Sequence, residues 1–381
     1  MSALLPTYQR HDIELVEGTG SFVTDAQGKT YLDFMMGIAV CNTGHRHPEV
    51  EKRLHAQLGQ LWHTSNLFES SKQERVATLL TTNSHLSHVF FCNSGTEANE
   101  GAFKLIRKWT QKTEILSFSQ SFHGRTFAMM GATGQDKVKE GFGEMVSDFK
   151  HLTFNDFESL DAITEDTGAV WLEVIQGEGG IILAENEWLE ALMERTQAYG
   201  VKIVIDEVQT GIGRTGSRFA FEQTPLKPDI ITVAKGLGSG FPVGAIITTP
   251  EAATIFTPGT HGSTFGGNPL AMTAAEATLE LILTEQTLRS VQEKGEYLMK
   301  QLNVFLPENQ IRTIRGRGLM IGIEFKQPVA SIVLSLQQAG MLVVSAGPTV
   351  IRLLPSLFVT EYELDLAVEK IKQVCQQEVI A

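Results

Sequence analysis

The sequence predicts an α/β fold, with a mostly parallel central sheet in a large domain and a smaller α+β domain built from both termini. From about residue 88, short apolar or β-branched runs alternate with stretches of helical spacing. These runs are apolar on both faces, which is typical of parallel strands that helices cover on both sides. The 381 residues are also many for one simple core, which favours one large and one smaller domain.

Five apolar runs are the expected strands of the large domain. They are HVFFC (88–92), TEILSFS (113–119), AVWLEVI (169–175), VKIVI (201–205) and DIITVA (229–234). Helices are expected at SGTEANEGAFKLIRKW and at NEWLEALMERTQAYG, which ends on a glycine that can stop a helix. Because ligands of such sheets bind at the carboxyl ends of the strands, the residues that follow the strands are the first candidates for a site.

The two ends of the chain predict the smaller domain. Strands are expected at GLMIGIEF (318–325) and MLVVSAG (341–347), with a helix at ASIVLSLQQAG between them and a final amphipathic helix at ELDLAVEKIKQVCQQ. Near the start, LVEGTGSFVTDAQGKTYLDF resembles a hairpin that packs beside this part. We therefore expect an N-terminal segment over 1–40 that packs with the small domain, a large domain over 41–270 and a C-terminal small domain over 271–381.

The composition describes an ordinary globular protein, with 42% hydrophobic and 20% charged residues. A formal net charge of −13 argues against a nucleic-acid or anionic-membrane partner. Cys41, Cys92 and Cys375 lie far apart and form no C-x-x-C pair, so we expect reduced thiols and neither a disulfide framework nor a metal site. The start MSALLPTYQR lacks the pattern of a signal peptide, and no apolar run approaches the length of a membrane span. These features favour a cytoplasmic protein.

Lys235 is the first candidate for chemistry, because it directly follows the run DIITVA and precedes Gly236, Gly238 and Gly240. Most loop lysines are simply exposed. This one lies where the ligand crevice of the sheet is expected, and the glycines let a bulky group approach the backbone closely. A lysine that loses its water can become a neutral amine and attack an aldehyde.

The run VKIVIDEVQTG ends another expected strand on Asp206 and Glu207. Two acids at such a place can belong to an exposed turn. A carboxylate there can also pair with the nitrogen of a pyridine ring, which keeps the ring protonated and able to accept electrons. In that case Val208 would lie on one face of the ring and Gln209 would hydrogen-bond its oxygen.

The run FFCNSGTEANEG is typical of a strand, a tight turn and a helix start. Ser94 and Glu97 fit the S-x-x-E capping box, which alone would explain the pattern. Gly95 and Thr96 also offer backbone N–H groups and a hydroxyl at a helix N-terminus, which is a favourable place for a phosphate.

Two further loops supply candidate side chains. SFHGRTF contains Phe122 and His123, which can equally be a core and a surface residue. Arg125 is a candidate clamp for a substrate carboxylate, because a guanidinium binds carboxylate in a planar fork. The loop GTHGSTFGGNP offers the hydroxyls of Ser263 and Thr264 to an anion.

The run GIGRTG (211–216) matches G-x-G-x-x-G, the dinucleotide fingerprint, and makes a nicotinamide-dependent oxidoreductase the alternative from another class. That fingerprint leads directly from a strand into a helix. Here DEVQT intervenes, and the following SRFAFEQTPLKPD holds two prolines and no convincing helix. The surrounding sequence argues against this alternative.

Together these segments resemble the class III (subgroup II) pyridoxal-phosphate aminotransferases of the fold-type-I superfamily. The runs SGTEAN, FHGRT, EVIQGEGG, IDEVQTGIGRTG, AKGLGSGFPVGA and HGSTFGGNP occur in the order of that family, and the resemblance extends from GIAVCNTGHRHPEV to VIRLLPS. It implies an enzyme that moves amino groups with pyridoxal 5'-phosphate and that forms a homodimer with shared active sites. Val174 is a small departure, because proline is common there.

The resemblance also implies roles for the matching positions. Lys235 would bind the cofactor as an imine and then move a proton between substrate and cofactor, while Asp206 would pair with the ring nitrogen; these two are the catalytic residues. Thr264 would reach the phosphate in the neighbouring subunit. The cofactor-binding set implied by the resemblance is Gly95, Thr96, Phe122, Asp206, Glu207, Val208, Gln209, Lys235 and Thr264.

The implied substrates are acetylornithine and 2-oxoglutarate or glutamate, since the GIAV segment and the residues before GGNPL resemble that branch of the family. Succinylornithine, ornithine and 4-aminobutyrate stay open as alternative amine donors, although Ile38 stands where ornithine-specific relatives tend to carry tyrosine. Ser263 and Arg125 would contact substrate. Arg352 would bind the α-carboxylate of glutamate, and Glu178 would cover this arginine during the other half-reaction, when it would otherwise be an unpaired charge.

Overall fold

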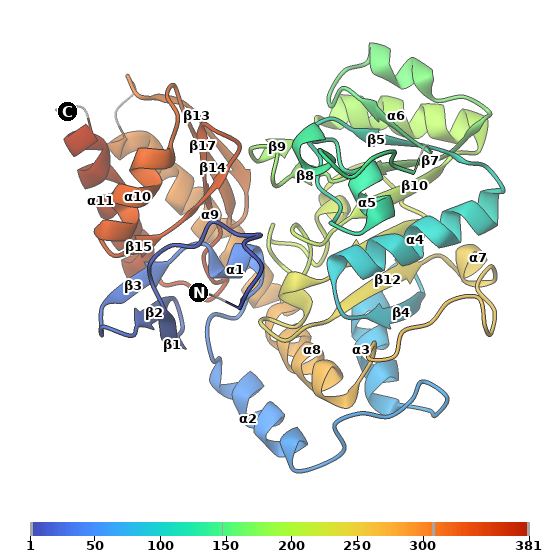
Figure 1. Ribbon diagram of the computed structural model, residues 1–381, viewed down its shortest axis with the longest axis horizontal. Helices are drawn as coiled ribbons and strands as arrows, with labels where there is room; N and C mark the ends of the chain where they lie inside the picture. The colour runs from blue at the N-terminus through green and yellow to red at the C-terminus, as the bar shows by residue number, and fades with distance from the viewer. Residues whose placement is uncertain (1–2, 147, 307–308, 379–381) are drawn as a thin grey trace.

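The computed structural model describes residues 3–146, 148–306 and 309–378, and its largest sheet confirms the predicted α/β fold (Figure 1). Among the described strands, β12 alone runs antiparallel to its neighbours in this sheet, and the other adjacent pairs are parallel. The described part of the sheet has seven strands in the order β4 (His88–Cys92), β12 (Gly244–Thr248), β11 (Ile230–Val233), β10 (Lys202–Asp206), β7 (Thr167–Leu172), β5 (Glu114–Phe118) and β6 (Phe149–Leu152).

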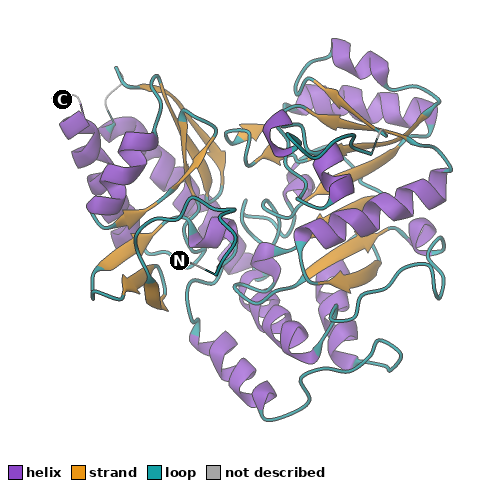
Figure 2. Cartoon of the chain, in the orientation of Figure 1, coloured by secondary structure: helices purple, strands orange, loops and turns teal. Residues whose placement is uncertain are grey.

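Helices cover both faces of this sheet, as the apolar runs predict (Figure 2). Val204 of β10 packs into the apolar cluster formed with α4 (Gly95–Thr110), whereas Ile205 packs into the cluster that contains α6 (Asn186–Tyr199). Within the described ranges, no helix combines the length and apolar character needed to cross a membrane. The remaining helical elements up to residue 282 are α1 (Met36–Ala39), α2 (Pro48–Leu58), α3 (Ser71–Thr81), α5 (Phe127–Ala132), α7 (Pro250–Ala253), α8 (Pro269–Ile282) and the 3₁₀ turns η1 (Asp136–Val138), η2 (Glu158–Ala162), η3 (Ala220–Gln223) and η4 (Lys235–Leu237).

A second, antiparallel sheet lies in the C-terminal part of the chain. Its described strands follow the order β13 (Ile311–Arg317), β14 (Met320–Phe325), β17 (Val350–Leu353) and β16 (Val344–Ala346). The helices α9, α10 and α11 pack against this sheet or against one another. Their bounds are α9 (Glu285–Phe305), α10 (Ala330–Gln338) and α11 (Glu361–Glu378).

The two ends of the chain meet through a third sheet. The first three strands, β1 (Leu15–Thr19), β2 (Phe22–Asp25) and β3 (Thr30–Asp33), pair antiparallel, and β3 pairs in parallel with β15 (Met341–Leu342). Figure 1 accordingly shows the blue N-terminal strands beside the red C-terminal elements. In contrast, α8, at the start of the expected C-terminal domain, packs against α2 and α3.

Two expected strands are each divided in the structure. The run 341–347, expected as one strand, gives β15 and β16, which belong to different sheets. The run 169–175 leaves the main sheet at Leu172, and its last part becomes β8 (Ile175–Gln176), which pairs with β9 (Ile182–Leu183). This second division matters for the site, because Glu173 and the loop between β8 and β9 now extend beyond the sheet.

Candidate active site

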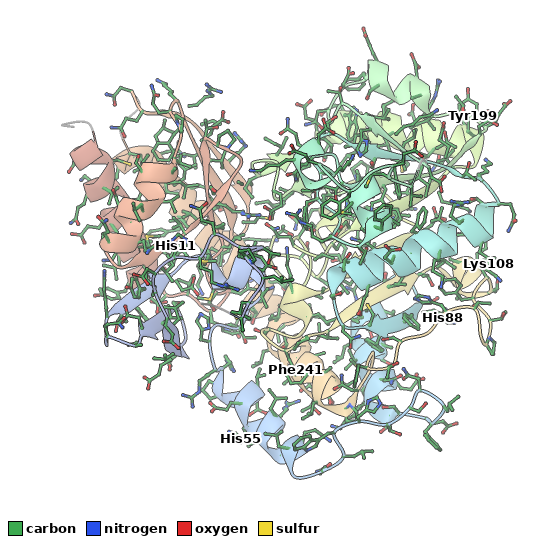
Figure 3. The ribbon with its side chains drawn as sticks, viewed as in Figure 1. His11, His55, His88, Lys108, Tyr199 and Phe241 are labelled. Atoms are coloured by element: carbon green, nitrogen blue, oxygen red, sulfur yellow. The ribbon has the colours of Figure 1, made fainter. Side chains whose placement is uncertain are left out.

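A cavity of about 410 Å³ lies at the carboxyl ends of the central strands. Figure 3 labels one of its lining residues, Phe241, near α8. Asn93, Asp206 and Ala234, which also line it, lie at or directly after the ends of β4, β10 and β11. This is where ligands bind in sheets of this kind. The cavity brings together most of the residues expected from the sequence, namely Gly95, Thr96, Phe122, Arg125, Glu178, Asp206, Val208, Gln209 and Lys235.

Lys235 lies where β11 ends and η4 begins. Its φ of 40° is in the left-handed region, which a residue with a side chain adopts only where the surrounding structure enforces it. Desolvation lowers the pKa of its amine, and the nearby charge of Arg352 acts in the same direction. The uncharged amine, which is the nucleophilic form, is therefore favoured relative to a lysine in water.

Asp206 is held in one orientation at the end of β10 by three donors. Its Oδ2 accepts hydrogen bonds from Asn99 Nδ2 and His123 Nδ1, both at 2.8 Å, and its Oδ1 accepts one from the Val208 N–H at 3.0 Å. The carboxylate is only 4% exposed. A buried carboxylate fixed in this way can present its charge to a protonated ring nitrogen, and it needs no rearrangement to do so.

The start of α4 forms the polar end of the cavity. Ser94 Oγ caps the helix by accepting a hydrogen bond from the Glu97 N–H at 3.3 Å, as the capping interpretation predicts. The Glu97 carboxylate accepts from the Asn93 N–H and not from Ser94, so only half of the expected capping box forms. Val208 packs so closely on Gly95 that a Cβ at this position would lie only 2.8 Å from Val208 Cγ1, so a side chain here would clash. Thr96 Oγ1 lies 2.9 Å from Thr126 Oγ1. The N-terminus of this 16-residue helix, with hydroxyls around it, suits a phosphate.

Arg352 is fully buried in β17, and Glu178 covers one edge of it. Its Nη1 donates to Glu178 Oε1 and to Gln209 Oε1, each at 2.8 Å. Its Nε and Nη2 find no hydrogen-bond partner among the described residues. Although desolvation acts in the opposite direction, the Arg352 charge holds the pKa of Glu178 below its usual value. A buried guanidinium with two unpartnered nitrogens is suited to binding a carboxylate once its cover moves aside.

Other expected residues lie at the rim of the cavity or outside it. Arg125 is exposed and lies over the Phe122 ring at 5.8 Å, and no described carboxylate pairs with it. Ser263 Oγ accepts from the Gly266 N–H at 3.0 Å, outside the cavity, and Thr264 is exposed. In a single chain, the loop that holds Ser263 and Thr264 does not line the cavity.

Glu207 faces away from the cavity, unlike the cofactor contact expected from the sequence. Its fully buried carboxylate accepts hydrogen bonds from Thr210 Oγ1 and from the N–H groups of Ala220 and Phe221. Because successive side chains of a strand point to opposite faces, Asp206 and its neighbour cannot both face the same ligand. Through these hydrogen bonds, Glu207 instead stabilises the loop that follows β10.

The run 211–216 forms turns between β10 and η3 and does not open a helix, so it lacks the context of the dinucleotide fingerprint. Its Arg214 is fully buried, with Nη1 donating to the carbonyl oxygens of Leu319 and Pro355 and Nη2 donating to Asn42 Oδ1. This run connects the central sheet to the C-terminal part of the chain.

Three residues of the site carried no assigned role in the sequence, and one of them is His123, which is buried and donates to Asp206. Asn99, which holds Asp206, lies inside the SGTEAN run, and Glu173 lies inside an expected strand. Glu173 is buried beside the cavity and accepts hydrogen bonds from the N–H groups of Phe122 and Gly177, while burial raises its pKa to about 7. The signal for Glu173 was a carboxylate that interrupts the apolar run 169–175, whereas Asp206 comes at the end of its run.

The groups in the cavity fit a phosphorylated aromatic aldehyde. The cavity contains the Lys235 amine with its lowered pKa and the fixed Asp206 carboxylate. It also contains the Phe122 ring, the apolar side chain of Val208 and the N-terminus of α4. These features suit an enzyme that uses the ring of such a cofactor to draw electrons from a substrate.

The chain belongs to the class-III aminotransferases, whose family model matches residues 6–375. These are pyridoxal-phosphate enzymes, and the chain is a pyridoxal-phosphate-dependent aminotransferase.

Similar proteins support the family at both the sequence and the structural level. The chain is 54% identical to the acetylornithine aminotransferase of Bacillus cereus over 375 residues, which cover 98% of this chain and 97% of the relative. It is 52% identical to that of Bacillus subtilis, with the same coverage. The structure resembles the N-acetylornithine aminotransferase of Stenotrophomonas maltophilia, with a TM-score of 0.86, 34% identity and coverage of 98% of each chain. For the ornithine aminotransferase of Toxoplasma gondii the TM-score is 0.94 at 28% identity, covering 98% of this chain and 93% of that chain.

Proposed function

We propose that the enzyme transfers the δ-amino group of N2-acetyl-L-ornithine to 2-oxoglutarate and releases N-acetylglutamate 5-semialdehyde and L-glutamate, a step of arginine biosynthesis. The observation that carries this proposal is the buried Arg352, whose Nη1 pairs with Glu178 and whose Nε and Nη2 have no hydrogen-bond partner among the described residues. The identity of 54% to an acetylornithine aminotransferase supports the choice of donor.

The residues of the cavity would hold the cofactor by several independent contacts. When bound, pyridoxal phosphate supplies an aldehyde for the amine and a ring that withdraws electrons from the substrate carbon. Lys235 Nζ would hold it covalently, and Asp206 would keep its ring nitrogen protonated. Phe122 and Val208 would enclose the ring, and the Gln209 side-chain N–H would reach its oxygen.

Lys235 Nζ would also act on protons. Once the substrate amine has displaced it, the free amine would take a proton from the substrate carbon and deliver it to the cofactor carbon C4′, on the other side of the intervening nitrogen. Its lowered pKa favours the uncharged form that accepts this proton. The negative charges of Glu178, Asp206 and Glu173, which act to raise this pKa, would stabilise the protonated form after the transfer.

Glu178 and Arg352 would let one cavity accept two kinds of substrate. Glutamate carries a carboxylate next to its reacting amine, and the unpartnered Nε and Nη2 of Arg352 would bind it once Glu178 has moved aside. Acetylornithine has no carboxylate at that end, so Glu178 would neutralise the buried arginine during that half-reaction. The exposed Arg125 would bind the distal carboxylate in both cases.

We propose that the enzyme is a homodimer in which Thr264 reaches the phosphate bound by the partner chain. The connection between α2 and α3 lies against the loop of Thr264, because Asn66 Nδ2 donates to the carbonyl oxygens of Ser263 and Gly266. Large apolar side chains on these two segments are 59–89% exposed, which is typical of a surface that a partner covers. They are Leu61, Trp62, Leu67, Phe68 and Phe265.

The test of the donor is a comparison of kcat/KM for acetylornithine, succinylornithine, ornithine and 4-aminobutyrate with 2-oxoglutarate as acceptor. We expect the highest value for acetylornithine. A higher value for free ornithine or 4-aminobutyrate would assign the enzyme to another branch of the same family.

A further inference from the structure

Two arginines occupy matched positions on the C-terminal sheet. Arg315 of β13 is paired with Gly322 of β14, and Gly322 is paired in turn with Arg352 of β17. Residues directly opposite one another in antiparallel strands project from the same face of a sheet. The two arginines therefore lie on one face, on either side of a residue without a side chain. Figure 1 shows β8 and β9 extending toward this sheet.

The backbone that follows Glu178 docks between these arginines. Arg315 Nε and Nη2 donate to the Gly180 carbonyl oxygen at 3.1 and 2.6 Å, and Nε also donates to the Ile181 carbonyl oxygen at 2.9 Å. The Ile181 side chain is fully buried over Gly322, where a Cβ on the glycine would lie 2.9 Å from Ile181 Cβ. The segment 178–181 thus contacts the sheet at three places, through Arg352, Gly322 and Arg315.

The docked segment holds an unfavourable backbone conformation. Ile181 has a φ of 56°, which a β-branched residue rarely adopts, and Gly180 has a φ of 112°. Such a conformation persists only where the surrounding contacts impose it. Arg315 is well placed to do so, because Glu324 of β14 pairs with its Nη1 and holds the guanidinium against the segment.

Glu178 lies between two cavities. Besides the active-site cavity, its side chain lines a separate cleft of about 470 Å³, formed between the two halves of the chain. The cleft contains Arg315 and Glu324 on one side and Gln120 and Gln135 on the other. A rotation of the Glu178 side chain toward this cleft would open Arg352 to a substrate carboxylate.

We propose that Arg315 is a positioning residue that determines substrate specificity. Its hydrogen bonds fix the backbone of residues 180–181, so that Glu178 reaches Arg352 and covers it. This inference rests on the proposed alternation of Glu178 between two states. Without Arg315 the strained segment relaxes, Glu178 covers Arg352 less often, and the half-reaction with acetylornithine suffers more than the half-reaction with glutamate.

The experiment measures both half-reactions of the purified holoenzyme by single-turnover spectroscopy in Arg315→Met and Arg315→Lys. We expect the ratio of the acetylornithine rate to the glutamate rate to fall roughly tenfold in both variants, because a positioned group is lost. The lysine variant keeps the charge but cannot make the forked contacts, so it separates anchoring from charge. Binding of glutarate, followed by fluorescence, should tighten a few-fold, since Arg352 is less often covered.

Arg312→Met is the matched control. Arg312 lies on the same strand and pairs with the same Glu324, at 2.9 Å. Its side chain is 61% exposed and, within the described residues, makes no hydrogen bond or ion pair with residues 178–181. We expect the ratio of the two half-reactions and the glutarate affinity to stay within about twofold of the unchanged enzyme.

A second comparison tests whether Arg315 acts through Glu178. In Glu178→Ala, adding Arg315→Met should change the ratio by less than about twofold, because contacts that act through one group are not additive. An equal loss of both half-reactions in Arg315→Met, or an additive effect in the double variant, would overturn the proposal and leave Arg315 a structural residue. If Glu178→Ala alone leaves the ratio unchanged, the proposed alternation itself fails.

Discussion

Single residues of this site owe their properties to burial and to partners from distant parts of the chain. Asp206 accepts hydrogen bonds from Asn99 and His123, which precede it by 107 and 83 residues. Arg352 donates to Glu178 and Gln209, which precede it by 174 and 143 residues. Each charge is buried but paired, which is the condition under which a protein tolerates a buried charge.

Lys235→Ala should remove nearly all turnover and the cofactor link that borohydride can reduce. The amine is expected to be both the point of attachment and the group that moves the proton. Mass spectrometry of the reduced protein measures the link directly, and Lys108→Ala, an exposed lysine of α4, is the control (Figure 3). A reduced link that persists in Lys235→Ala would assign the cofactor to another lysine.

Asp206→Asn should preserve the fold and slow proton abstraction by roughly a hundredfold or more, because a preorganised charge is removed from a desolvated site. The asparagine oxygen can still accept from the Val208 N–H or from Asn99, so the cavity keeps its shape. Single-turnover rates with acetylornithine at matched cofactor content give the measurement. Unchanged rates would show that the ring does not depend on this carboxylate.

At the scale of helices and strands, the sequence predicts the strands that are buried on both faces and the helices next to them. The strands β4, β5, β10 and β11 and the helices α4 and α6 appear as expected, because apolar runs and a capping serine identify them locally. The strand β12 was missed, since its residues directly follow the glycine-rich segment after Lys235. The division of 341–347 between two sheets could not be predicted, because an apolar run does not indicate where strand pairing changes.

The same limit applies to the site. The family resemblance implies one contact between distant motifs, that of Glu178 with Arg352, and the structure has this contact. Other contacts between motifs could not be predicted. The contacts of Gln209 with Arg352 and of Arg315 with Gly180 join segments 143 and 135 residues apart, and no local pattern encodes them. Glu207 was misplaced because the alternation of side chains depends on where β10 ends. The proposed domain boundaries stay a prediction.

The loop after β10 yields a prediction about pH. Burial raises the pKa of Glu207 to about 7 from an ordinary value of 4.5, and the charge of Glu222 acts in the same direction. The folded state therefore binds a proton more tightly than the unfolded state. Stability from this group is complete below about pH 4.5 and is lost as the pH rises to about 7, by on the order of 3 kcal/mol.

Glu207→Gln removes this titration while keeping the size of the side chain. The difference in Tm between the unchanged protein and the variant should be largest near pH 5, decline up to about pH 7 and then stay constant. Thermal unfolding at a series of pH values measures it. A difference that is constant across this range would mean that Glu207 is already ionised in the folded protein at pH 5.

At the scale of the whole molecule, the central sheet and its loops supply most residues of the cavity, and the C-terminal sheet supplies Arg352 and Arg315. The site therefore depends on how these two parts are held together. Arg214 contributes to this, because it joins the loop after β10 to the carbonyl oxygens of Leu319 and Pro355. The proposed dimer would add a third part, the loop of Thr264.

Trp62→Glu should dissociate the proposed dimer and weaken cofactor retention, since a charge would enter an apolar contact surface. Trp62 is 59% exposed in the single chain, and Tyr362 on α11, at 73%, is the matched control. Sedimentation velocity measures the assembly, and absorbance measures the bound cofactor. A dimer that persists in Trp62→Glu, or is lost equally in Tyr362→Glu, would place the interface elsewhere.

The central claim is that Glu178 and Arg352 let one cavity serve two substrates. Its most direct test is single-turnover spectroscopy of each half-reaction in Glu178→Ala and Arg352→Ala. Glu178→Ala leaves Arg352 open, so it should keep the glutamate half-reaction and lose the acetylornithine half-reaction by roughly tenfold or more. Arg352→Ala should show the opposite bias, with part of its acetylornithine activity retained. If both variants lose both half-reactions in the same proportion, the claim is wrong, and specificity must come from Arg125 and the shape of the cavity.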